Sequence, residues 1–207
     1  TGTSLSGSTG GILLETGDAR TGQAGGITLS VGSSASGVAG AITLTAGEFA
    51  SHDSDDGSEN NGGSIKLVSG TSQTGSTGAI IVKTADGPVT DDDTAIGSGN
   101  LALSIGTSYS GAGGNMIGVA GDTSSVDYDG GCIQLRAGNS AGKGGAVELK
   151  SGAGSQGSGI IEVSTPDSVE DGTGGDILLS TGTSQTRSGS ICLSTGSSLT
   201  GSAGAIT

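Results

Sequence analysis

Residues 25–47 read GGITLSVGSSASGVAGAITLTAG and contain two copies of one short unit. In each copy an isoleucine, Ile27 or Ile42, has a glycine two positions before it and a leucine two positions after it. Apolar and polar residues alternate through the unit, which is typical of a strand that buries one face. The glycine density and the β-branched isoleucines argue against a helix.

The same unit recurs thirteen times, each copy centred on an apolar residue that we call the anchor. A glycine, here the common glycine, lies two residues before every anchor. In the twelve complete units, leucine follows the anchor by two residues in nine and glycine follows it by five in ten. The anchors are Ile12, Ile27, Ile42, Ile65, Ile80, Leu101, Met116, Ile133, Val147, Ile161, Ile177, Ile191 and Ile206.

A short strand between glycines cannot bury its apolar face alone, so the units are expected to stack on one another. Stacked rungs about 4.8 Å apart predict an all-β fold, a single-chain β-solenoid of about thirteen units of roughly 15 residues. The longest insertions, after Ile42, Ile80 and Met116, follow odd-numbered units. This favours two units per coil over one. Residues 1–207 are interpreted as one continuous repeat array, a segment of a longer repetitive chain.

The common glycines are expected at the corners of the coils, where the chain needs positive φ or a close approach of two backbones. Open ends of such a coil expose unpaired strand edges, and no cap is evident at Thr1 or Thr207. Head-to-tail stacking of copies is therefore expected.

The composition excludes an ordinary thick core. The chain has 45 glycines, 34 serines and 24 threonines, and these small residues make up 103 of its 207 positions. Only 31% of residues are hydrophobic and 1% aromatic. The net charge of −13 argues against nucleic-acid partners, and no apolar run is long enough to insert into a membrane.

Acidic residues gather between the units, where they suggest a calcium site. Ca²⁺ takes six to eight oxygen ligands, so dense carboxylates with backbone carbonyls would suit it. The alternative is a solvated edge that keeps the protein soluble. The candidate metal ligands are Asp53, Asp55, Asp56, Glu59, Asp91, Asp92 and Asp93.

No catalytic or cofactor-binding residues are predicted, and the protein is not expected to be an enzyme. His52 is the single histidine, with no motif that would hold a nucleophile beside it. Glycoside hydrolysis by paired carboxylates would want basic and aromatic residues to grip the sugar, and the seven lysines and arginines are dispersed. Cys132 and Cys192 are too far apart in the predicted coil to bridge, which leaves free thiols or a link between chains.

Some apolar residues are expected to face outward just after their anchors, namely Leu13, Ile81, Ile117 and Leu178. A stripe of them suggests a lateral protein interface, and the alternative is scattered surface residues. Serine and threonine are frequent enough to carry O-linked glycans.

Residues 25–47 and 174–196 resemble the Gly/Ser/Thr-rich repeat arrays of extracellular β-solenoid surface proteins, of the adhesin and algal or protist type. The resemblance implies a long secreted solenoid that works as a fibre, stalk or adhesive. We therefore expect a structural subunit of an extracellular fibre or cell-surface appendage, which assembles with itself by strand stacking and lateral contacts. The alternative is a calcium-dependent adhesin or an ice-binding module, although Leu13 and Lys66 interrupt the threonine array that ice would need.

Overall fold

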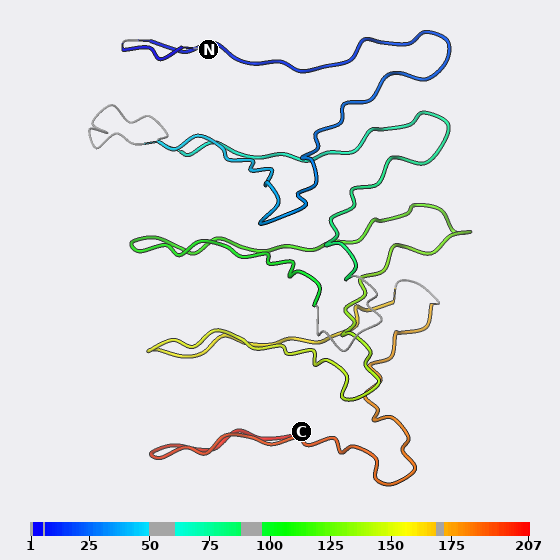
Figure 1. Ribbon diagram of the computed structural model, residues 1–207. Helices are drawn as coiled ribbons and strands as arrows, with labels where there is room; N and C mark the ends of the chain where they lie inside the picture. Colours follow the sequence, from blue (N-terminus) through cyan, green and yellow to red (C-terminus); the bar gives the residue numbers. More distant parts are fainter. Residues whose placement is uncertain (1, 6, 50–60, 88–96, 169–171) are drawn as a thin grey trace. The chain divides into compact units, whose positions relative to one another are not determined.

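A computed structural model describes residues 2–5, 7–49, 61–87, 97–168 and 172–207. Over these ranges the chain forms turns, bends and extended stretches, with no helix and no strand, and Figure 1 draws it as a plain tube. The chain divides into two units, Thr1–Leu103 and Ser104–Thr207. The prediction of an all-β, single-chain β-solenoid is therefore wrong, and the assignment of two units per coil falls with it.

The predicted core is absent for the same reason. No described residue is buried, and the side chains that should have faced the inside of the coil face solvent, with Ile27 49% and Leu29 68% exposed. A solenoid would have covered them with the rungs above and below. In the described chain, backbone hydrogen bonds instead form only where the chain doubles back.

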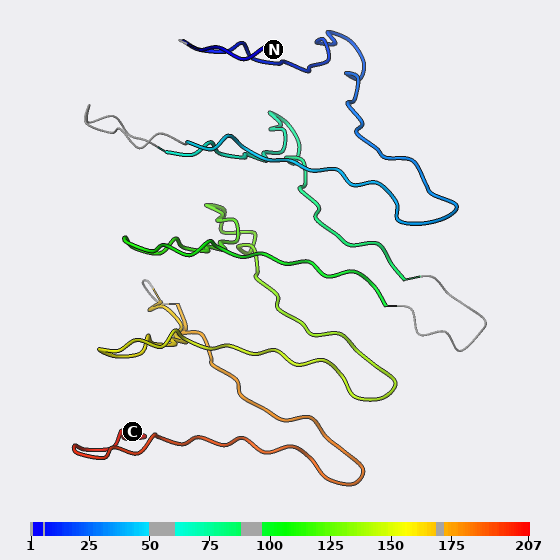
Figure 2. The ribbon, with the colours of Figure 1, turned by 60° about the vertical axis from the view of Figure 1, so that its left-hand side comes forward.

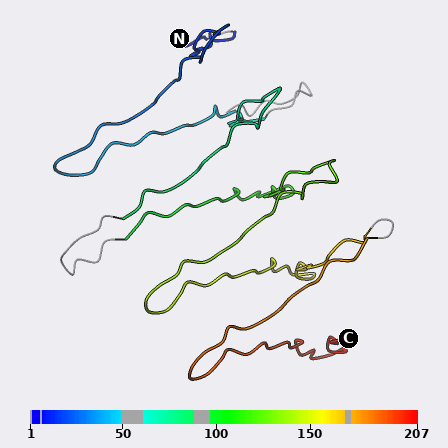
Figure 3. The same ribbon diagram turned by 90° about the vertical axis from the view of Figure 1, so that its right-hand side faces the viewer.

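These reversals give the chain its local order, and they can be followed in the turned views (Figure 2, Figure 3). We call the residues from a common glycine to the fifth residue after its anchor a segment, and the residues between two segments a connection. In five connections the common glycine donates its N–H to the carbonyl oxygen of the last residue of the preceding segment. The bonds are Gly63–Gly47 at 2.8 Å, Gly78–Gly70 at 3.0 Å, Gly131–Gly121 at 2.8 Å, Gly145–Gly138 at 3.0 Å and Gly159–Gly152 at 2.8 Å.

One side chain lies against the common glycine at every connection. It belongs to the fourth residue after the preceding anchor, which we call the closing residue. In all twelve cases, an atom of the closing residue lies within 4 Å of the position that a Cβ on the common glycine would occupy. The closing residues are Thr16, Val31, Ala46, Ser69, Thr84, Ile105, Ala120, Ala137, Ser151, Thr165, Thr181 and Thr195.

Some closing residues are also the most covered residues of the described chain. Five residues of the described chain are partly buried, whereas all others are classed as exposed, and all five are closing residues. They are Ala46, Ser69, Thr84, Ala120 and Ala137. The expected close approach of two backbones is found at the five common glycines that make the backbone hydrogen bond, whereas at the other seven the atoms within 4 Å belong to the closing side chain alone. Positive φ is found at Gly7, Gly22 and Gly37, none of which is a common glycine.

The side chain of the closing residue is related to whether the backbone hydrogen bond forms at the base of the connection. All five connections with the backbone hydrogen bond have alanine or serine at this position, and none of the seven with threonine, valine or isoleucine has the bond between described residues. A β-branched side chain places a second γ atom beside the glycine and keeps the two backbones apart. At Val31 and Ile105 a γ-carbon lies only 2.7 and 2.8 Å from the position of the absent glycine Cβ.

Threonine can replace the missing backbone bond with its hydroxyl group. Thr16, Thr165 and Thr181 donate from Oγ1 to the carbonyl oxygen of the following common glycine, at 3.0, 3.2 and 3.3 Å respectively. These connections are thus closed by a side-chain donor, whereas alanine and serine allow the main chain to close them directly.

Several connections turn around a serine. Ser72, Ser108 and Ser198 each accept a hydrogen bond on Oγ from the N–H of the glycine three residues later, at 2.9, 3.0 and 2.9 Å. Short polar side chains commonly fix turns by bonding to the nearby main chain. The S-x-x-G pattern is therefore the turn signal of these connections.

Candidate interaction surface

The anchors and the residues two positions after them form two exposed series, which we call the apolar rows. The anchors are 49–63% exposed except for Ile12, which is 86% exposed. Eleven of the residues two positions later are leucine or valine, and these are 64–74% exposed. The narrow ranges mean that nearly every segment presents the same two side chains in a similar way.

The residues predicted to form a lateral interface are more exposed still. Leu13, Ile81, Ile117 and Leu178 are each 78–86% exposed, as an interface needs, and their role stays a prediction. Sequence reasoning missed that the apolar rows are also exposed to solvent, because it assigned them to a core. The alternation of apolar and polar residues could not reveal this, since it marks an apolar face without showing whether that face is covered.

Charge is divided sharply between segments and connections. The segments carry four acidic residues, Glu15, Glu148, Glu162 and Asp176, and four basic residues, Lys66, Lys83, Arg136 and Lys150. These cancel, so the whole net charge of −13 lies in the connections. The apolar rows themselves contain no ionisable carboxylate or amine.

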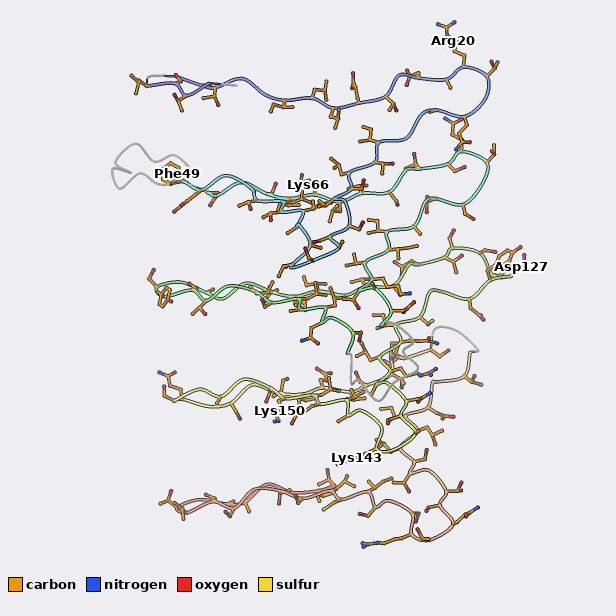
Figure 4. The ribbon with its side chains drawn as sticks, viewed as in Figure 1. Arg20, Phe49, Lys66, Asp127, Lys143 and Lys150 are labelled. Carbon is orange, nitrogen blue, oxygen red and sulfur yellow. The ribbon has the colours of Figure 1, made fainter. Side chains whose placement is uncertain are left out.

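Two exposed ion pairs lie at segments of the described chain. Lys83 Nζ lies 3.0 Å from Asp86 Oδ2, and Lys150 pairs with Glu148. Exposed pairs of this kind contribute about 0–1 kcal/mol. Figure 4 shows labelled side chains of both classes, with Lys66 and Lys150 on segments and Arg20, Asp127 and Lys143 on connections.

The predicted calcium ligands, Asp53 to Glu59 and Asp91 to Asp93, lie outside the described residues, as does His52. Among the residues that the structure describes, no three His, Cys, Asp or Glu side chains are grouped so as to hold a metal ion. Calcium binding therefore stays a prediction.

If the acidic connections bind calcium, a chelator should lower the melting temperature of the protein, because bound metal stabilises the state that binds it. Thermal unfolding with and without excess chelator measures the effect, and magnesium serves as the control cation. An unchanged melting temperature would contradict calcium binding.

The two cysteines, Cys132 and Cys192, are exposed free thiols. In the described part of the chain, no helix is long and apolar enough to cross a membrane.

No protein-family model, no curated protein and no solved structure matches the chain.

Proposed function

We propose that the protein is a structural subunit of an extracellular fibre or filament that assembles from copies of this chain. The observation that carries the proposal is the uniform repetition of one local arrangement. Twelve successive connections place a closing residue against a common glycine, and nearly every segment between them presents an apolar pair to solvent. A surface that repeats along the whole chain suits periodic contacts better than the binding of one small ligand.

The charge distribution supports the same function. Segments with at most one net charge each can approach one another closely, whereas carboxylates in the connections repel at short range and favour solubility at the edges. The extracellular location rests on the resemblance of the repeat to Gly/Ser/Thr-rich surface proteins. The proposal assigns no catalytic activity to the protein.

Electron microscopy of the purified chain tests the proposal. We expect fibres, and diffraction from aligned fibres should show a spacing near 4.8 Å if extended segments of neighbouring copies pair through their backbones. Discrete particles at high protein concentration, with no fibres over a range of salt and pH, would contradict the fibre function.

A further inference from the structure

The area of the chain exceeds what a compact protein of its mass exposes. The accessible surface is 20595 Å², whereas a folded protein of 19.3 kDa exposes about 8,500 Å². The excess of about 12,000 Å² is several times the roughly 1,600 Å² that a standard protein–protein interface buries. Enough surface is therefore available for more than one extensive contact.

That surface includes aliphatic side chains, together with main-chain groups that make no hydrogen bond to other main-chain groups. The apolar rows supply two aliphatic side chains per segment, and most are half to three-quarters exposed. Monomeric soluble proteins rarely leave large contiguous apolar areas uncovered. The main-chain hydrogen bonds that are formed join the first residue of a segment to the last residue of the segment before it, so in the described chain the N–H and C=O groups between these ends have no main-chain partner.

A partner for this surface must meet two requirements. It must offer aliphatic side chains and main-chain donors and acceptors at the spacing of the segments, and it must carry little net charge where it touches them. A basic partner would be drawn instead to the connections, which hold the entire net charge of −13. The segments of a second copy of this chain meet both requirements, because they repeat the same pattern and their own charges cancel.

We infer that the apolar rows are an interface between copies of this chain, and that the segments pair with segments of neighbouring copies through their side chains and backbones. This inference deepens the proposed function by naming the surface and the partner. The closed connections stay within each copy, because their closing residues already contact their own common glycines. Carboxylates in the connections then lie at the margin of the interface, where water can solvate them.

Two glutamates placed on one row test the inference. Leu135→Glu with Leu149→Glu puts charge at two exposed row positions, which are 74% and 67% exposed in the single chain. The matched control is Val126→Glu with Tyr128→Glu, which adds the same charge at exposed positions of the connection between Gly121 and Gly131. Neither pair removes a closing contact of the chain itself.

Analytical ultracentrifugation over a range of concentrations measures the association. The unaltered chain should sediment as more than one copy, the row variant should associate at least about tenfold more weakly, and the control should stay within a factor of two. Amide hydrogen exchange in residues 132–138 should be slow in the associated protein and fast in the single chain. A chain that sediments as one 19.3-kDa copy at all concentrations overturns the inference. Equal association of the row variant and the unaltered chain also overturns it.

The outcomes separate this inference from the fibre function. Small discrete oligomers that the row variant dissociates would support the interface and contradict the fibre. Fibres that form equally well from the row variant would support the fibre function and contradict the interface.

Discussion

Replacing Gly131 by alanine is expected to open the connection between Gly121 and Gly131. The new Cβ would lie 3.0 Å from the amide nitrogen of Gly121 and 3.3 Å from the Cβ of Ala120, and neither the main chain nor an alanine can rotate away. The backbones must separate, which removes the 2.8 Å hydrogen bond from Gly131 to Gly121. Overpacking and the lost bond together are expected to cost about 1–3 kcal/mol.

Hydrogen exchange of the residue-131 amide measures this effect, and protection should fall by roughly tenfold or more. The neighbouring glycine is a matched control, because a Cβ at Gly130 would lie 3.8 Å from the Gly121 carbonyl oxygen, an ordinary contact distance. Gly130→Ala should leave the exchange of the residue-131 amide within about twofold of the unaltered value. Similar losses in both variants would show that the common glycine has no special packing role.

Swapping alanine and threonine at the closing position is expected to change which hydrogen bond forms at the base of the connection. Thr181→Ala removes the hydroxyl that donates to the Gly189 carbonyl oxygen at 3.3 Å, and it removes the γ atoms that separate the backbones. The Gly189 N–H should then bond to the Gly182 carbonyl oxygen, as in the five connections that have alanine or serine. Ala120→Thr should do the reverse and release the Gly131 N–H.

The measurement is again amide exchange, with opposite signs in the two variants. A hydrogen bond worth about 1 kcal/mol corresponds to roughly a fivefold change, slower for Gly189 in Thr181→Ala and faster for Gly131 in Ala120→Thr. Thr181→Ser is the control that keeps a hydroxyl while removing the β-branch, and it should behave like Thr181→Ala at Gly189. If exchange shifts in the same direction in both variants, side-chain size does not govern closure.

The closing contact links these local effects to assembly. Each connection has a closing residue against the following common glycine at its base, and this marks where one segment stops and the next begins. A connection that opens would change the spacing of segments on either side of it. Variants such as Gly131→Ala are therefore expected to weaken association indirectly, whereas the paired leucine replacements weaken it through the interface itself.

Particular positions show which predictions from the sequence agree with the structure. Alignment on the anchors identified the common glycines and predicted positive φ or a close backbone approach there, and two backbones do approach closely at five of them. The alternation in residues 27–31 predicted a strand with one buried face, and that prediction was wrong, because the described chain has no strand. The inference that Ile27 and Leu29 lie in a core of the same chain was wrong, because both are exposed.

The error has a simple physical origin. Alternating side chains show that a segment has one apolar face, but hydrogen bonds and apolar contacts form equally well to the same chain or to another. Sequence similarity among units makes these alternatives chemically alike. In the sequence, alanine at position 120 and threonine at position 181 also looked equivalent, because both residues are small and both fit the repeat.

The sequence by itself determined the repeat, the position of its glycines and the separation of neutral segments from acidic connections, because these follow from residue type and spacing alone. Only the tertiary structure decided which hydrogen bond, from the main chain or from a threonine hydroxyl, forms at the base of eight connections, and that the apolar rows stay exposed. Those outcomes depend on which backbones approach within a few ångströms of each other, and residue order does not fix that distance.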